Sequence, residues 1–433
     1  MRETYSWGRY PAVEQSSHAM YWRNEALPQA GTMLPYGQGR SYGDVCLNDG
    51  GIVVATSNLQ RFIHFDDTKG ILRAEAGVTL AQILSLIMPR GWFLPVTPGT
   101  KFVSLGGAVA NDVHGKNHHR AGSFACHVSA FELLRSDGER LHCTPTQNSE
   151  WFQATVGGLG LTGLITWVEL SLKPISGPYI DQRLVRFKNL ADFLQLNEAM
   201  EQEAEYTVAW IDCLARGKQL GRGLYMAGNH AAGEGASIKT RDEPSISMPM
   251  DAPAFLLNKF TVQAFNAVYY NKPRRAVTQV HYDGFFYPLD KIAHWNRMYG
   301  KRGFFQYQCV IPLVQAESAL EKTLDTIAQS GQASFLSVLK KFGDNTAPGL
   351  LSFPRAGITL ALDIANRGSK TRQLLRQLDD ITMANNGAVY PAKDACMSAA
   401  AFAQYFPAWK TFSKYIDPHF SSSFWRRVSQ TNG

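Results

Sequence analysis

The chain has 433 residues, of which 45% are hydrophobic and 18% are charged, and its formal net charge is +7. This balance excludes a mostly disordered chain, and the length predicts two or three domains around a sizeable core. No apolar run reaches the roughly 18 residues of a membrane-spanning helix, and Met1–Trp7 lacks the apolar segment of a signal peptide.

Up to residue 175 the sequence alternates short strands with short helices and is punctuated by glycine. The apolar residues of Leu80–Ile87 recur at helical spacing and stop before Pro89, which predicts a short helix. The pair Asp137-Gly138 indicates the turn of a hairpin. The strands expected in this part are Gly51–Thr56, Arg61–Phe65, Ile71–Glu75, Val128–Arg135, Arg140–Cys143 and Leu161–Leu172.

After Pro178 the elements become longer, which predicts a domain boundary near residue 177. Helices are expected at Asn189–Glu205, Pro253–Tyr270, Ala316–Ser330 and Ser369–Asn385. Strands are expected at Thr207–Asp212, Arg222–Ala227, Phe304–Pro312, Ser334–Phe342 and Gly357–Asp363. Gly, Ser, Pro and charged residues dominate from Gly228 to Met250 and predict a mobile loop. The expected fold class is therefore α+β with two domains.

The first chemical motif is the glycine-rich stretch Pro35-Tyr36-Gly37-Gln38-Gly39-Arg40-Ser41-Tyr42-Gly43-Asp44. Glycines let successive backbone N–H groups curve around an anion, and Arg40 and Ser41 add side-chain donors, so the stretch suits a pyrophosphate. Neither standard nucleotide motif matches, because the order is G-x-G-x-x-x-G and no Lys-Ser/Thr follows. An ordinary glycine-rich turn is the alternative.

The second motif runs from Thr97 to His119. It contains a face of small residues that would let a helix approach a ligand closely, namely Gly106, Gly107, Ala108 and Ala110. Its histidines lack the HExxH spacing of a zinc site, which makes a metal centre the weakest interpretation. Two other interpretations are open for His114, His118 and His119. They could be ordinary histidines of a loop, or one of them could lie beside a redox cofactor.

The third motif places four glycines at the start of the last strand expected before Pro178, namely Gly157, Gly158, Gly160 and Gly163. Glycines at such a junction indicate either the close approach of another backbone or a tight turn. No G-x-S-x-G nucleophile elbow occurs in the chain, so the residues give a hydrolase little support.

In this order the three motifs resemble the FAD-binding domain of the vanillyl-alcohol oxidase (PCMH-type) flavoprotein family. The resemblance implies an FAD-binding domain at 1–177, a substrate-binding domain at 178–387 built on an antiparallel sheet flanked by helices, and a C-terminal segment at 388–433 that returns to the FAD domain. It implies FAD contacts at Pro35, Tyr36, Gly37, Gln38, Gly39, Arg40, Ser41, Tyr42, Gly43, Asp44, Val45, Gly99, Ser104, Leu105, Gly106, Gly107, Asn111, Asp112, Val113, His114, Ile165 and Tyr390.

Within the family, Gly39–Asp44 and His114–His119 look like a branch that oxidises the 2′-hydroxyl of a polyprenylphosphoryl-β-D-ribose-like pentose with non-covalent FAD. The likeness continues through Phe286–Asp290, Leu351–Pro354 and Val389–Asp394. It implies a 2′-keto product in the first half of an epimerisation to the arabinose form, which a partner short-chain reductase would complete. An FAD-dependent oxidase of a soluble sugar, alditol or aldonolactone is the alternative.

The resemblance implies catalytic roles for Lys393, His114 and Tyr42. Lys393 would stabilise the anionic reduced flavin or the developing alkoxide, and His114 or Tyr42 would accept or relay the hydroxyl proton. One position departs from the branch, because Ala361 stands where members have a pocket cysteine. The alternative for Lys340 and Lys393 is that they are lysines of edge strands without a role in catalysis or binding. Substrate contacts are implied at Lys116, Trp210, Gln306, Gln308, Lys340 and Lys393.

Six cysteines without a C-x-x-C pair favour reduced thiols, so we expect a cytoplasmic protein, with peripheral contact to the inner membrane. Apolar residues of Pro253–Arg275 recur near helical spacing before the basic cluster Lys272-Pro273-Arg274-Arg275, as in helices that lie on anionic membranes. Packing onto the substrate domain is the alternative for this segment. A basic module that binds RNA would leave the glycine motifs unexplained, and no nucleic-acid partner is expected.

Overall fold

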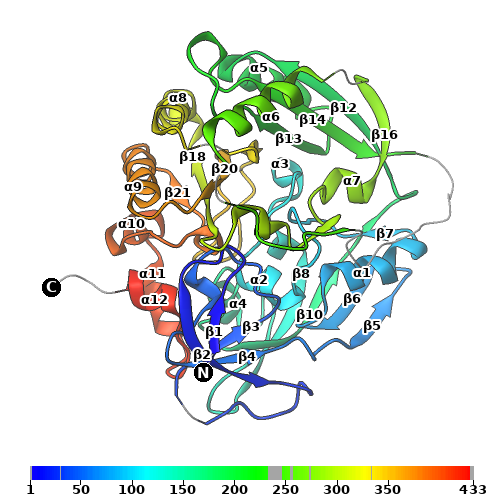
Figure 1. Cartoon of the computed structure of the whole chain (residues 1–433). Helices are drawn as coiled ribbons and strands as arrows, with labels where there is room; N and C mark the ends of the chain where they lie inside the picture. Colours follow the sequence, from blue (N-terminus) through cyan, green and yellow to red (C-terminus); the bar gives the residue numbers. More distant parts are fainter. Residues whose placement is uncertain are drawn as a thin grey trace.

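The computed structural model of the chain describes residues 2–29, 31–232, 246–253, 257–272, 275–332 and 334–429. The N-terminal elements, blue to cyan in Figure 1, form one half of the molecule, and a large sheet with its helices forms the other half. No helix of these described stretches is long and apolar enough to cross a membrane.

Two sheets form the N-terminal half. The order β1-β2-β4-β3 makes a four-stranded sheet in which β4 is parallel to both β2 and β3, and the order β5-β6-β10-β8-β9 makes an antiparallel sheet. The bounds are β1 Arg2–Tyr5, β2 Ala12–Ala19, β3 Met33–Tyr36, β4 Ile52–Ala55, β5 Phe62–Asp66, β6 Ile71–Glu75, β8 Val128–Leu134, β9 Arg140–Cys143 and β10 Leu164–Ser171. A separate pair joins β7 (Trp92–Phe93) to β11 (Lys173–Pro174).

Short helices connect these strands. The first, α1 (Leu80–Ile87), begins with a capping box, in which the Thr79 hydroxyl accepts a hydrogen bond from the Gln82 N–H and the Gln82 side chain accepts one from the Thr79 N–H. It gives way to a 3₁₀ turn at the Met88-Pro89 step, as the sequence predicts. The others are α2 (Leu105–Ala110), α3 (His118–Ala121) and α4 (Ser149–Thr155).

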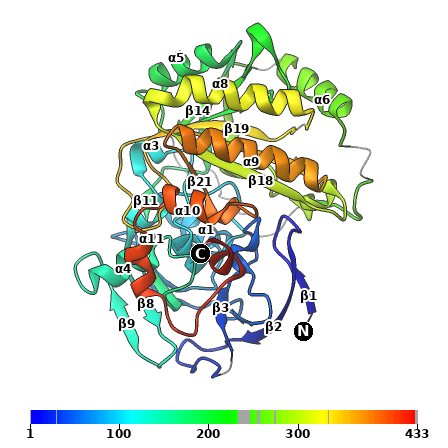
Figure 2. The ribbon, with the colours of Figure 1, turned by 90° about the vertical axis from the view of Figure 1, so that its left-hand side faces the viewer.

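The second half is built on an eight-stranded antiparallel sheet of order β16-β12-β14-β13-β19-β20-β18-β21. Its strands are β12 Tyr179–Phe187, β13 Tyr206–Ile211, β14 Gly223–His230, β16 Val277–His281, β18 Phe304–Ile311, β19 Ser337–Phe342, β20 Gly357–Ala365 and β21 Ala388–Val389. Helices α5 (Leu190–Met200), α8 (Leu313–Ser330) and α9 (Ser369–Ala384) cover one face (Figure 2). Two further helices are α6 (Lys259–Asn271) and α7 (Tyr282–Phe286), and β15 (Ile246–Ser247) pairs with β17 (Ile292–Ala293).

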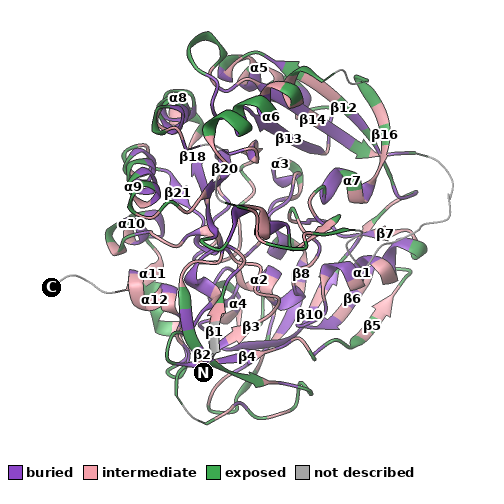
Figure 3. Cartoon of the chain, viewed as in Figure 1, coloured by how far each residue is buried: buried purple, intermediate pink, exposed green. Residues whose placement is uncertain are grey.

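The two faces of this sheet differ in polarity because side chains alternate along a strand. On β18, Phe305, Tyr307 and Cys309 pack into the core shared with the helices. Gln306 and Gln308 point the other way, toward the N-terminal half. The sheet therefore supplies polar side chains at the junction of the two halves. Figure 3 shows that its strands β18 and β20 are largely buried.

After β21 the chain crosses back to the N-terminal half through α10 (Ala399–Tyr405), α11 (Trp409–Phe412) and α12 (Ser423–Val428). The Met33 N–H donates to the His419 carbonyl at 2.7 Å, and the Ser423 N–H donates to the Leu47 carbonyl at the same distance. The chain thus contacts its own beginning again near its last described residues. The three domain limits remain a prediction.

The predicted elements are present, with shifted ends. The loop predicted at Gly228–Met250 is wrong at both ends, because β14 continues in register with β12 to His230 and Ile246 already belongs to β15. Its residues 233–245 lie outside the described residues. The predicted helix Pro253–Tyr270 begins only at Lys259, where Asn258 caps α6. Residues 254–256 and the pair Pro273-Arg274 of the basic cluster are likewise outside the described residues.

Candidate active site

The three glycine motifs lie against one another. A Cβ on Gly37 would lie 2.1 Å from the Ser104 Oγ, and a Cβ on Gly160 would lie 3.3 Å from the Pro35 ring. The Leu159 N–H donates a hydrogen bond of 2.8 Å to the last carbonyl of α2. Glycines of the first and third motifs therefore allow these close approaches, and the three motifs form one shared wall.

Between this wall and the polar face of the large sheet lies a cavity of about 400 Å³. Ligand pockets in proteins commonly measure roughly 300–1,000 Å³. Its lining includes most of the residues that the sequence singles out, namely Pro35, Gly37, Gln38, Gly39, Arg40, Ser41, Tyr42, Val45, Gly99, Ser104, Gly106, Gly107, Asn111, Val113, His114, Lys116, Ile165, Trp210, Gln306, Gln308, Lys340, Tyr390 and Lys393.

Five of the singled-out residues lie outside the lining, namely Tyr36, Gly43, Asp44, Leu105 and Asp112. Leu105 is fully buried in the core, and Asp112 accepts a hydrogen bond of 2.5 Å from the Ser352 hydroxyl. A Cβ on Gly43 would lie 1.5 Å from the Asp394 carbonyl oxygen, so only glycine permits this approach. These residues pack outside the cavity lining and stabilise the segments that form it.

Two polar groups on the glycine side fit a dinucleotide cofactor such as FAD. In the described part of the chain Arg40 makes no ion pair, and its guanidinium lies 4.1 Å over the Trp7 ring, free to meet a pyrophosphate. The buried Oδ1 of Asn111 has no hydrogen-bond partner, although its Nδ2 donates to the Gly107 carbonyl at 2.9 Å. A ligand with an N–H group would satisfy that oxygen. The residues present therefore fit FAD.

His114 stands where the glycine side meets the sheet. Its Nε2 lies 2.9 Å from the Gln308 Nε2, and its Nδ1 lies 3.2 Å from the Lys340 Nζ. Burial, with Lys340 next in importance, lowers the pKa of His114 well below its usual value. The ring is therefore neutral at pH 7 and keeps one nitrogen without a proton.

Three lysines give the cavity its charge. Burial lowers the pKa of Lys116 and of Lys393 to about 7 and the pKa of Lys340 to about 8. The neighbouring Asp363 opposes the effect at Lys393 by stabilising its cation. An anion in the cavity would favour the protonated form of all three, so the site is suited to an anionic ligand.

The placement of two of these lysines corrects the sequence interpretation. Lys340 lies on β19, which is a central strand between β13 and β20. Lys393 is not on a strand at all but ends the 3₁₀ turn Pro391–Lys393. Neither is an edge-strand lysine, and both line the cavity.

Sequence reasoning missed Asp363, which lies on β20 behind the glutamines. Its carboxylate accepts a hydrogen bond of 2.5 Å from the Gln306 Nε2 and one of 3.4 Å from the Tyr299 hydroxyl. Burial raises its pKa to about 7. The single charged residue in the otherwise uncharged, buried strand Gly357–Ala365 is the signal that could have identified it.

The histidines of the second motif separate in the structure. His118 is buried away from the cavity, with its ring 4.5 Å from that of Phe342, and the His119 ring is 3.1 Å from the Ala204 carbonyl. Among the described residues no three His, Cys, Asp or Glu side chains are placed to hold a metal ion.

Comparison with known proteins agrees with this site. Residues 25–144 match the family model of an FAD-binding domain. The chain is 35% identical over 412 residues to decaprenylphosphoryl-β-D-ribose oxidase of Mycolicibacterium smegmatis, which covers 92% of this chain and 89% of the relative. It is 32% identical over 371 residues to an uncharacterised protein of Streptomyces coelicolor, covering 81% and 100%. Human Δ24-sterol reductase is 32% identical over 117 residues, 27% of this chain and 23% of the reductase.

An FAD-binding domain that faces so basic a pocket is the arrangement of a flavin-dependent enzyme, and this chain is an FAD-dependent oxidoreductase that acts on a CH–OH group. It belongs to the family of decaprenylphosphoryl-β-D-ribose oxidase, a PCMH-type flavoprotein. The predicted α+β fold class, the predicted FAD and the predicted enzyme class are confirmed.

Proposed function

We propose that the chain oxidises the 2′-hydroxyl of a polyprenylphosphoryl-β-D-ribose-like lipid-linked pentose to the 2′-keto sugar. The observation that carries the proposal is the convergence of Lys116, Lys340 and Lys393 on one cavity, next to the wall of glycine motifs that fits FAD (the FAD side). Buried cations are stabilised by an anion such as the phosphate of a sugar phosphate. The name of the mycobacterial relative, a decaprenylphosphoryl-ribose oxidase, supports the same substrate class.

The sheet side supplies groups that suit a sugar. Gln306 and Gln308 lie two residues apart on β18 and both line the cavity, where their amides can meet hydroxyl groups. The Trp210 indole also lines it and is held by a hydrogen bond of 2.9 Å to the Phe335 carbonyl. A fixed aromatic face beside amides binds and orients a pentose ring.

When bound, FAD supplies the acceptor for the hydride that leaves the carbinol carbon. Lys393 stabilises the negative charge that develops on the substrate oxygen. The unprotonated ring nitrogen of His114 accepts the hydroxyl proton when the substrate hydroxyl takes the place of one of its protein partners. Lys393 favours this transfer by stabilising the substrate oxyanion, although its charge lowers the pKa of the His114 ring. Burial raises the pKa of Tyr42 well above its usual value, so its hydroxyl stays protonated and acts as a donor.

We infer that FAD is held without a covalent bond. Both ring nitrogens of His114 already have partners in the protein, Gln308 on one side and Lys340 on the other. The ring is therefore poorly placed to bond a flavin carbon. The glycine wall and Arg40 provide contacts enough for non-covalent binding.

A lipid-linked substrate also favours contact with a membrane, and α6 is the element suited to it. Phe260 and Val268 are 78% and 69% exposed, whereas Tyr269 of the same helix lines the cavity. Figure 3 shows that much of α6 is exposed. The opposite face is anchored by Asn266, whose Nδ2 donates to Asp212 at 2.8 Å. An apolar outer face beside the cavity can rest on a bilayer while the head group enters.

The keto product implies a partner, because its conversion to the arabinose form needs a reduction that a short-chain reductase would supply. The test of the whole proposal is anaerobic bleaching of the bound flavin against a panel of sugars. We expect bleaching by polyprenylphosphoryl ribose and none by free ribose, alditols or aldonolactones. Equal bleaching by a free sugar would overturn the lipid-linked assignment in favour of a soluble-sugar oxidase.

A further inference from the structure

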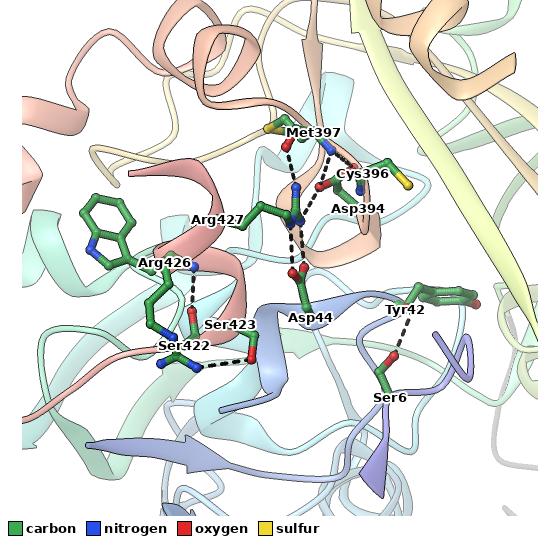
Figure 4. Close-up of polar contacts among 11 residues, drawn as sticks. Ser6, Tyr42, Asp44, Asp394, Cys396, Met397, Ser422, Ser423, Arg426 and Arg427 are labelled. Carbon is green, nitrogen blue, oxygen red and sulfur yellow. Dashed lines mark hydrogen bonds and ion pairs between the residues drawn. The ribbon is translucent and has the colours of Figure 1, made fainter. Parts of the chain in front are cut away.

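Arg427 of α12 joins two segments that are distant from it and from each other in the sequence (Figure 4). Its Nε and Nη2 donate to the two carboxylate oxygens of Asp44 at 2.9 and 2.7 Å. The same Nη2 donates to Asp394 at 2.9 Å, and Nη1 donates to the Met397 carbonyl. The planar fork of arginine thus holds two carboxylates that are each less than a tenth exposed.

The two acids belong to two segments that line the cavity, although neither acid lines it itself. Asp44 ends the first glycine motif, and Asp394 directly follows Lys393. The two segments are also joined through the backbone, because the Tyr42 N–H donates a hydrogen bond to the Ala392 carbonyl at 2.9 Å. Without a cation between them, Asp44 and Asp394 would repel each other at this contact.

We propose that Arg427 is a positioning residue that fixes the FAD-holding motif and the Lys393 turn at one separation. Arg427 itself does not line the cavity, so it acts through the two segments it joins. A displacement of about 1 Å between a cofactor and a catalytic group is enough to slow a reaction about a hundredfold. The proposal rests on the proposed role of Lys393 for its effect on the reaction, but not for its effect on FAD.

The chain offers a matched control in the neighbouring residue. Arg426 also joins α12 to the N-terminal half, donating to the Asn48 side chain at 2.8 Å and to the Asp49 carbonyl at 3.0 Å. Among the described residues it makes no hydrogen bond or ion pair with Asp394 and, like Arg427, it is only partly buried. A purely structural role in docking α12 would make the two arginines equivalent.

The experiment compares Arg427→Lys and Arg427→Met with Arg426→Lys and Arg426→Met in the full chain. Three quantities are measured: the melting temperature, the Kd of FAD for the apoprotein from flavin fluorescence, and the rate of anaerobic flavin reduction per bound FAD. Lysine keeps the charge but loses the fork, so Arg427→Lys tests the geometry even where Arg427→Met does not fold.

We expect Arg427→Lys to weaken FAD at least about tenfold and to lower kcat per bound FAD by a similar factor with little change in KM. We expect Arg426→Lys to change the Kd of FAD and the kcat per bound FAD by less than about twofold each. Equal losses in the two lysine variants, or a lower melting temperature with unchanged FAD affinity and kcat, would overturn the proposal. The FAD titration contains no substrate, so a failure of the proposed reaction leaves its result standing.

Discussion

The ammonium group of Lys393 lies 3.9 Å from the centre of the Tyr42 ring. The two residues come from opposite ends of the chain and meet in the cavity lining. An aromatic face stabilises a cation at this distance, which partly compensates the burial of Lys393. Tyr42 therefore holds the lysine at the boundary between the FAD side and the sheet side.

Substitution Lys393→Ala is expected to preserve FAD binding and to slow substrate-driven flavin reduction about 10²–10³-fold, the usual effect of removing one preorganised electrostatic group. Stopped-flow absorbance of the flavin measures the rate. The exposed Lys410 of the same C-terminal segment supplies the control variant Lys410→Ala. A normal rate in Lys393→Ala would make that lysine structural.

The pH dependence of the reaction is expected to have an alkaline limb. In the proposed function the lysine cations bind the phosphate and stabilise the oxyanion. We therefore expect kcat/KM to decrease as pH rises through their pKa values, about 7 for Lys116 and Lys393 and about 8 for Lys340. A bound anion raises these pKa values, so the limb of kcat lies at higher pH than that of kcat/KM.

A comparison of Lys340→Met with Lys341→Met checks this assignment. Lys341 is the next residue on β19 and pairs with Glu201 at 2.7 Å, away from the cavity lining. Only Lys340→Met is expected to change the pH profile. Two coincident profiles would assign the alkaline limb to other groups.

Acid precipitation of the purified protein is expected to release all of its yellow colour into the supernatant, since His114 is engaged on both ring nitrogens. Absorbance of the supernatant and of the washed pellet measures the two fractions. Flavin that stays with the pellet would show a covalent bond and contradict the inference.

Acid is expected to destabilise the fold through His118. Both of its buried ring nitrogens lack a hydrogen-bond partner, and burial lowers its pKa to about 4. Between the unfolded value near 6.5 and this folded value the unfolded state binds more protons, so stability decreases as pH falls through that window. The loss is up to about 3 kcal/mol.

Urea unfolding at pH 7.5 and pH 5 measures this effect. In His118→Leu the difference in the free energy of unfolding between pH 7.5 and pH 5 is expected to shrink. His18 is exposed, so the control variant His18→Gln is expected to keep the wild-type difference. The same pH difference in His118→Leu and wild type would assign the acid sensitivity to other residues.

The wild-type protein is expected to sediment with anionic lipid vesicles at low salt, and the variant Phe260→Ser with Val268→Ser is expected to remain in the supernatant. The control is Val314→Ser, because Val314 of α8 is 93% exposed but lies on another helix. Loss of binding in the control as well, or no binding by the wild type, would contradict a membrane role for α6.

Local patterns in the sequence predict what is local in the structure. The helix α1 (Leu80–Ile87) and the strand β6 (Ile71–Glu75) form at the predicted residues. Their signals, helical spacing and strand alternation, depend only on residues close together in the sequence. Gln306 and Gln308, two residues apart on a strand, necessarily share a face. Most of the residues that the family resemblance implies for the site, including Lys393, do line the cavity.

What the sequence does not predict depends on pairings between distant segments. Nothing near Arg427 indicates that it reaches Asp44 and Asp394, since ion pairs of that separation leave no periodic signal. The strand β12 was missed because its mixed polar residues match a solvated segment, yet it pairs on both sides with β14 and β16. Tertiary pairing overrides local propensity there.

The contact of Gly43 with the Asp394 backbone has a consequence for how the enzyme matures. The region that matches an FAD-binding domain ends at residue 144, whereas the turn that abuts its glycine motif lies some 250 residues later. Because a ribosome delivers the N-terminal part first, the nascent chain holds half a cofactor pocket while the rest is still being made. We therefore expect tight loading of FAD only after the turn around Asp394 has been made and can pack against the glycine motif.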